Sequence, residues 1–120
     1  MIFIIGGTYQ GKLDFAKAAF GITDADTYIC IDGDIDFSKQ CIYKIEEFAF
    51  WSEDPVAYFQ NHRQQWQDSI LICQDIFCGV VPMGAENRVW RQKTGRLCQY
   101  LSGEAEQVSR IFCGLEQRLK

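Results

Sequence analysis

Hydrophobic residues along this chain occur in short blocks separated by longer stretches of mixed character. Met1–Ile5 (MIFII) is apolar at every position, and Ser69–Cys73 (SILIC) is nearly so. Blocks of this kind are typical of strands buried on both faces of a parallel sheet, because neither face alternates with polar residues. Tyr28–Ile31 (YICI) and Val108–Cys113 (VSRIFC) are predicted as two further strands.

The stretches between these blocks have helical spacing. Leu13, Ala16 and Phe20 fall on one face of a helix that Gly21 ends. Further helices are predicted over 39–51 and over 54–66, the latter with Asp54 as N-cap and Pro55 at the first helical position. Residues 86–100 are predicted as a helix that is interrupted or bent near Gly95. Strands that alternate with helices predict an α/β fold, with helices on both faces of a mainly parallel sheet.

Length and composition limit the possible classes of protein. The chain has 120 residues, 48% of them hydrophobic, which predicts one folded domain over residues 1–120. Its formal net charge of −4 argues against sequence-independent binding to nucleic acid or to an anionic membrane. Neither a signal peptide nor an apolar stretch long enough to span a membrane is visible, so we expect a cytoplasmic protein.

The cysteines, the histidine and an acidic loop are weaker candidates for chemistry. Six dispersed cysteines without a CxxC pair favour reduced thiols in the core. The single histidine, His62, lies in a polar helical stretch, where a solvated or core-edge side chain is expected. The acidic stretch Asp32–Asp36 (DGDID) resembles the start of a calcium loop, but its glycine is misplaced and Tyr43 stands where the closing Glu belongs.

A candidate phosphate-binding motif follows the first strand. Gly6-x-x-x-x-Gly11-Lys12 has the spacing of a phosphate-binding P-loop between a strand and a helix, so backbone N–H groups and Lys12 are expected to bind phosphate oxygens. Leu13 stands where a P-loop has the Ser or Thr that binds Mg²⁺. The candidate binding residues are Gly6, Gly7, Thr8, Tyr9, Gln10, Gly11, Lys12 and Leu13. The alternative is a simple turn with a solvated lysine.

Two further candidates lie in the second half of the chain. Asp75 follows an apolar strand, as the Mg²⁺-binding acid of a Walker B motif does, although an ordinary surface aspartate fits equally well. Arg88, Arg91 and Arg96 are spaced so that several of them could share a helix face and contact phosphates. A solvated helix face is the alternative.

The C-terminal part carries a more specific pattern. The stretch from Cys73 to Pro82 (CQDIFCGVVP) is followed by Arg88, Arg91, Gly95-Arg96 and Gln99-Tyr100-Leu101, and the chain ends VSRIFCGLEQRLK. This pattern resembles the adenosylcobinamide kinase / adenosylcobinamide-phosphate guanylyltransferase family of cobalamin assembly. The resemblance covers both ends of the chain.

The resemblance implies a three-layer P-loop NTPase-like fold and a homo-oligomer, with trimers among the known members. It also implies phosphorylation of the cobinamide hydroxyl with ATP or GTP and Mg²⁺, followed by guanylyl transfer through a histidine. Nucleotide and corrinoid molecules are the implied partners, with Lys12 and Asp75 as catalytic residues and Asp75 as the metal ligand.

The chain departs from the family pattern at residues that carry chemistry. Leu13 replaces the P-loop serine, and Gln10, Asp75, Phe77, Gln92 and Cys98 replace family residues elsewhere. The interval before Asp75 is short, and His62 lies too close to Asp75 to match the guanylylated histidine. We therefore expect a nucleotide-binding protein with a weakened Mg²⁺ site that has lost guanylyl transfer. The alternative is a non-catalytic nucleotide- or corrinoid-binding paralogue, either a pseudoenzyme or a regulator.

Overall fold

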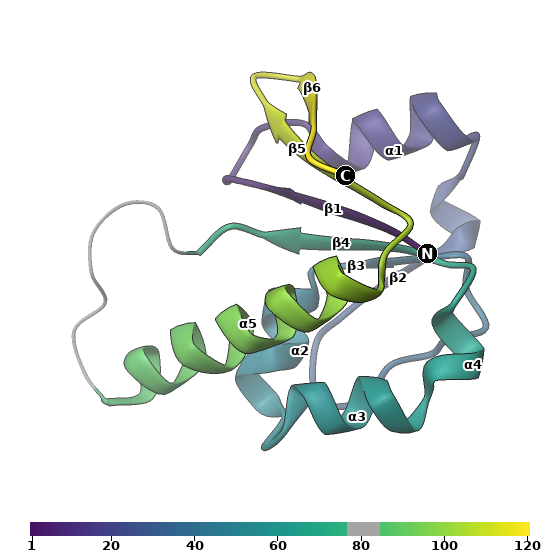
Figure 1. Ribbon diagram of the computed structural model, residues 1–120. Helices are drawn as coiled ribbons and strands as arrows, with labels where there is room; N and C mark the ends of the chain where they lie inside the picture. The colour runs from purple at the N-terminus through teal and green to yellow at the C-terminus, as the bar shows by residue number, and fades with distance from the viewer. Residues whose placement is uncertain (77–84) are drawn as a thin grey trace.

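The computed structural model describes residues 1–76 and 85–120 (Figure 1). The chain forms, in order, β1 (Ile2–Gly6), α1 (Lys12–Phe20), a 3₁₀ turn (Asp24–Asp26), β2 (Thr27–Ile29), β3 (Cys41–Tyr43), α2 (Ile45–Trp51), α3 (Pro55–Asn61), α4 (Arg63–Trp66), β4 (Ile70–Gln74), α5 (Ala85–Glu104), β5 (Gln107–Phe112) and β6 (Leu115–Arg118).

These strands form one sheet in the order β2-β3-β4-β1-β5-β6. All neighbouring strands are parallel except β6, which pairs with β5 in the antiparallel direction. β1 lies between β4 and β5, with Phe3 opposite Leu71 on one side and Val108 on the other. The N-terminal strand is therefore flanked by two strands from the second half of the chain.

Helices cover both faces of the sheet, because the apolar residues of each strand alternate between two cores. Phe3, Leu71 and Ile42 face α2, α3 and α5, while Ile4 and Ile72 face α1. Figure 1 shows α1 on one side of the sheet and α2, α3 and α5 on the other. The predicted α/β fold with a mainly parallel sheet between helical layers is confirmed.

The stretch 39–51 differs from the predicted single helix. Its first part forms strand β3, and α2 begins only at Ile45. Lys44 between them has a left-handed backbone with φ 62°, which separates strand from helix. Residues 41–43 pair with both β2 and β4, and these long-range hydrogen bonds outweigh the local helical spacing of Ile42, Ile45 and Ala49.

Two other element predictions needed correction, and one strand was missed. The predicted helix over 54–66 divides at His62 into α3 and α4. No interruption occurs near Gly95, since α5 is one helix from Ala85 to Glu104. A glycine costs an interior helix position about 1 kcal/mol, and the buried face with Leu97 and Leu101 outweighs this. The edge strand β6 was not predicted, because its residues are all exposed.

Within the described part of the chain, no helix is both long enough and apolar enough to cross a membrane.

Candidate functional site

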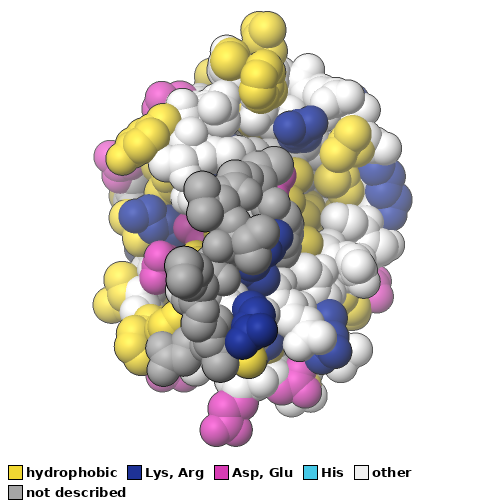
Figure 2. All heavy atoms as spheres, turned by 90° about the vertical axis from the view of Figure 1, so that its left-hand side faces the viewer, with side chains coloured by type: hydrophobic (Ala, Val, Ile, Leu, Met, Phe, Trp, Pro, Cys, Tyr) yellow, Lys and Arg dark blue, Asp and Glu magenta, His cyan; other side chains and the backbone are white. Residues whose placement is uncertain are grey.

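The parallel strands point toward one edge of the sheet, where the segments that follow β1, β3, β4 and β5 come together. Among described residues, only Tyr9, Lys44 and Cys113 combine a positive φ with a side chain, and each follows one of these strands. Strained backbone of this kind is concentrated at functional sites. Figure 2 looks onto this edge, where basic and acidic side chains are interspersed and hydrophobic ones project at the top.

The glycine loop after β1 combines a close backbone approach with an uncapped helix start. A Cβ on Gly6 would lie 2.6 Å from the Ile111 carbonyl oxygen, so only glycine fits between β1 and β5. Gly11 has φ 87° and begins α1 without a side-chain cap. The N–H groups of the first turn of a helix have no partner within the helix, so they are available to an anion.

Lys12 lies inside this loop rather than in solvent. Its residue is 7% exposed, and its Nζ donates a hydrogen bond of 2.6 Å to the Gly7 carbonyl oxygen. Burial lowers the pKa of Lys12, and the negative charges of Glu46 and Asp75 oppose that shift. The alternative of a solvated lysine is therefore wrong, and the ammonium lies at the centre of the loop.

Glu46 is a residue that the sequence analysis missed. It lies in the first turn of α2, is only 5% exposed, and accepts a 2.9 Å hydrogen bond from the backbone N–H of Gln74. Burial raises its pKa, although the hydrogen bond from Gln74 works in the opposite direction. Paired perturbed groups such as Glu46 and Lys12 are typical of functional sites. The predicted helix over 39–51 placed Glu46 in the middle of a helix. In the structure the helix begins at Ile45, so Glu46 lies in its first turn.

Asp75 lies directly after β4, and its backbone N–H donates a 2.7 Å hydrogen bond to the Gly6 carbonyl oxygen. This bond joins the end of β4 to the start of the glycine loop. The carboxylates of Asp75 and Glu46 both act on the charge of Lys12.

The residues of the loop offer hydrogen-bond donors rather than metal ligands. The uncapped first turn of α1 and Lys12 supply N–H donors, whereas the side chain of Leu13 has no oxygen for a metal. No cluster of three or more His, Cys, Asp or Glu residues suited to a metal occurs among residues 1–76 and 85–120. Asp75, with water completing the shell, is the residue that would hold Mg²⁺ at this edge.

Gln10 connects the loop to the β5–β6 hairpin. Its side-chain Oε1 accepts a 2.5 Å hydrogen bond from the Cys113 N–H, and its carbonyl oxygen accepts one of 2.9 Å from the Gly114 N–H. Gln10 therefore holds the loop against a segment more than a hundred positions later in the sequence, where φ of Gly114 is 75°.

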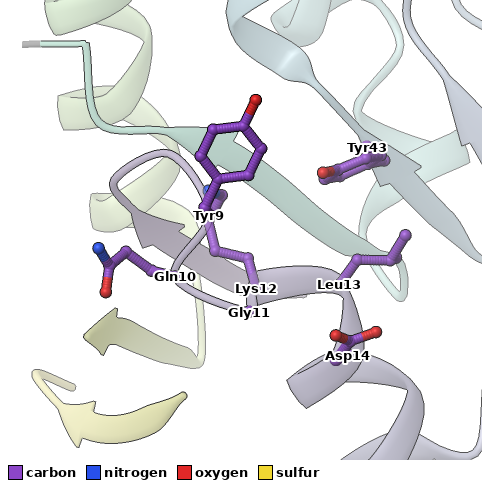
Figure 3. Close-up of a pocket in the computed structure, with 7 residues that line it drawn as sticks. All are labelled: Tyr9, Gln10, Gly11, Lys12, Leu13, Asp14 and Tyr43. Atoms are coloured by element: carbon purple, nitrogen blue, oxygen red, sulfur yellow. The ribbon is translucent and has the colours of Figure 1, made fainter. Parts of the chain in front are cut away.

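A pocket of about 400 Å³ opens beside the loop (Figure 3). It brings together five of the predicted residues and two that were not predicted. The lining residues are Tyr9, Gln10, Gly11, Lys12, Leu13, Asp14 and Tyr43.

The arginines of α5 do not line this pocket. Arg88 and Arg96 are exposed, and Arg91 is half-buried. Arg96 borders a separate hollow between α5 and the α2–α3 connection, together with Asp54 and Lys93. Lys93 donates to the carbonyl oxygens of Phe50 and Ser52, so its charge completes the C-terminal end of α2.

The weaker candidates lie outside the edge or are used locally. His62 packs against Phe37 and Tyr58 at the α3–α4 junction, far from the glycine loop in Figure 1. The carboxylates of Asp32 and Asp36 accept hydrogen bonds from the backbone N–H groups two residues later. The motif residues 77–84, including Phe77 and the GVVP segment, lie outside the described residues.

The fold and the loop together define a P-loop NTPase-like α/β protein. Within that class, the chain belongs to the cobinamide kinase / cobinamide phosphate guanyltransferase family, whose sequence pattern matches residues 22–119. No match to a curated protein was found.

The family match supports a cobinamide kinase/guanyltransferase-like role in cobalamin biosynthesis. Members of this family use the nucleotides GTP or ATP. The matched range begins after the glycine loop and includes Glu46, Asp75 and the arginines of α5. The residues of the glycine loop, 6–13, lie outside the matched range.

Proposed function

We propose that this protein binds the phosphates of ATP or GTP in the glycine loop and phosphorylates the hydroxyl of cobinamide, without guanylyl transfer. The observation that supports this most directly is the position of Lys12, which is buried inside an uncapped helix start with its ammonium on the loop. A family match over most of the chain supplies the substrate class.

Each residue at this edge then has a role in phosphoryl transfer. Lys12 releases the Gly7 carbonyl oxygen and donates instead to oxygens of the β- and γ-phosphates. The backbone N–H groups of residues 7–13 bind the remaining phosphate oxygens. The acceptor hydroxyl attacks the γ-phosphorus, the bond to the bridging oxygen breaks, and the nucleoside diphosphate leaves. Asp75 either holds Mg²⁺ or orients the hydroxyl and accepts its proton. Arg88, Arg91 and Arg96, which do not line the pocket, contact phosphates or the neighbouring subunit.

Mg²⁺ in such reactions neutralises the charge on the phosphates. With Leu13 in place of a hydroxyl side chain, the site keeps Asp75 as its protein ligand, and water replaces the missing oxygen. The expected consequence is nucleotide binding that depends only weakly on Mg²⁺, and slow turnover. Guanylyl transfer is proposed to be lost because His62 lies at the α3–α4 junction rather than at this edge.

The test is calorimetric titration of ATP and GTP, with and without Mg²⁺, into the wild type and the Lys12→Ala variant. Removing the ammonium is expected to weaken binding by more than tenfold, since a charge-assisted bond to phosphate contributes about 1.5–3 kcal/mol. Lys17→Ala is the matched control, because Lys17 lies in the same helix and pairs with Asp24 on the surface. Equal affinities of Lys12→Ala and wild type would refute the proposal.

The second candidate is a non-catalytic nucleotide- or corrinoid-binding protein, which the replacement by Leu13 favours. Phosphate transfer from radiolabelled nucleotide to cobinamide separates the two candidates. Turnover that disappears in both Lys12→Ala and Asp75→Ala identifies an enzyme. Binding without turnover in the wild type identifies a pseudoenzyme or regulator.

We also propose that residues 1–120 form one nucleotide-binding domain. The protein is proposed to act in the cytoplasm as a homo-oligomer, with a trimer as one expected form. Light scattering coupled to size-exclusion chromatography measures the molar mass directly. A monomer at all concentrations would contradict the oligomer.

A further inference from the structure

Three apolar side chains surround the pocket beside the glycine loop. Figure 3 shows the rings of Tyr9 and Tyr43 on either side of it, with the side chain of Leu13 extending toward Tyr43. Gln10 points away from Tyr43, toward the hairpin. The volume of about 400 Å³ lies in the range of small-molecule sites. Apolar walls offer no oxygen ligands to a hydrated metal ion, whereas an apolar group is stabilised by leaving water for such a pocket.

Tyr9 is the unusual member of this set. Its backbone has φ 58°, a region that is costly for a bulky residue, and its side chain is 99% exposed. No core packing offsets that backbone cost, since the ring is almost entirely in water. A function for the exposed ring accounts for both observations together.

Tyr43 and Leu13 form the fixed side of the pocket. Both are half-buried and pack against the core cluster beneath α1 that contains Ile4 and Ile72. Tyr43 is the last residue of β3, and the Lys44 ammonium lies 6.0 Å from the centroid of its ring. The pocket thus has a rigid apolar wall on one side and an exposed ring on the other.

We propose that Tyr9, Leu13 and Tyr43 bind a flat conjugated ring, which stacks on the ring of Tyr9 next to the phosphate-binding loop. The inference rests on the proposed function for the phosphates that lie beside this pocket. Two ligands of that function supply such a ring, namely the purine base of the nucleotide and the corrin macrocycle of cobinamide. Aromatic side chains stack on the π-face of a purine, and they pack against the conjugated part of a corrin ring.

The test compares Tyr9→Gly with the wild type by calorimetry, using GTP, inorganic tripolyphosphate and cobinamide as separate ligands. Affinity for the stacked ligand is expected to fall about tenfold, by a clearly larger factor than affinity for tripolyphosphate, which binds only the loop. Tyr9→Phe keeps the ring and is expected to restore binding. Because glycine adopts a positive φ without strain, Tyr9→Gly is also expected to be at least as stable as the wild type in thermal unfolding.

Each outcome is decisive. A selective loss for GTP assigns the pocket to the base, and a selective loss for cobinamide assigns it to the corrin ring. Unchanged affinity for both ring ligands overturns the proposal, as does an equal loss for tripolyphosphate, which would mean that Tyr9 shapes the loop. If the wild type binds neither GTP nor tripolyphosphate, the nucleotide function fails while the cobinamide titration still decides on the ring. A wild type that binds none of the three ligands overturns both.

Discussion

At the scale of single residues, the candidate site is organised around the buried charge of Lys12. Its ammonium donates to the Gly7 carbonyl oxygen, and the negative charges of Glu46 and Asp75 favour its charged form. Glu46 in turn is buried and accepts a hydrogen bond from the backbone N–H of Gln74. Charges removed from water are costly unless they are paired, so these residues depend on one another.

Glu46→Gln tests this dependence through pH. Burial raises the pKa of Glu46, so the folded state binds more protons than the unfolded state between its ordinary and its raised pKa. The stability of the wild type relative to Glu46→Gln is therefore expected to fall as pH rises through that window. The amide can still accept the hydrogen bond from the Gln74 N–H, so the variant isolates the loss of the carboxylate charge that acts on Lys12.

Urea unfolding at several pH values from 4 to 8 measures this difference. Glu47→Gln, in the same turn but exposed, is the matched control. A stability difference between Glu46→Gln and wild type that does not change with pH would contradict the raised pKa.

At the scale of elements, α5 holds the acidic side of the site in place by its contacts with α2. Trp90 donates its indole N–H to the Glu46 carbonyl oxygen at 2.8 Å, and Lys93 donates to the last carbonyls of α2. The position of the short α2, and so of Glu46, depends on these bonds from a helix about forty residues away in sequence.

Lys93→Met is expected to lower the free energy of unfolding by about 1.5–3 kcal/mol, because two bonds from a charged donor are lost. Urea denaturation measures the change. Gln92→Met is the control, since the neighbouring side chain on α5 is exposed, and its effect is expected within about 0.5 kcal/mol. Equal effects of the two substitutions would show that Lys93 is not a helix cap.

At the scale of the whole molecule, strand order decides which segments meet. β1 lies between β4 and β5, so the glycine loop contacts Asp75 on one side and the Cys113–Gly114 turn on the other. The glycine loop and the Cys113–Gly114 turn thus lie at the same edge of the sheet. The β5–β6 hairpin therefore also supports the glycine loop.

Gln10→Ala is expected to weaken nucleotide binding several-fold, because the loop loses its side-chain bond to the Cys113 N–H. The accompanying loss of stability is expected to be about 0.5–1.5 kcal/mol, the net contribution of one hydrogen bond. Calorimetry and thermal unfolding measure the two effects, with Gln60→Ala on the exposed face of α3 as control. Binding that survives unchanged would show that the hairpin does not position the loop.

The sequence by itself determined the features that depend on near neighbours. Met1–Ile5, the glycine loop and the helix from Leu13 to Phe20 were predicted in order and type, because apolar blocks, glycine spacing and helical periodicity are local properties. The α/β class followed from their alternation. The family was recognised from the spacing of Arg88, Arg91 and Arg96, although their roles stay predictions.

Only the tertiary structure decided what depends on strand order and packing. It split 39–51 into β3 and α2, because residues 41–43 gain hydrogen bonds from two strands distant in sequence. That split turned Glu46 toward Lys12 and placed Tyr43 across the pocket from Tyr9. It also placed Arg96 in a different hollow. These outcomes depend on contacts between segments far apart in the chain, and local spacing carries no signal of them.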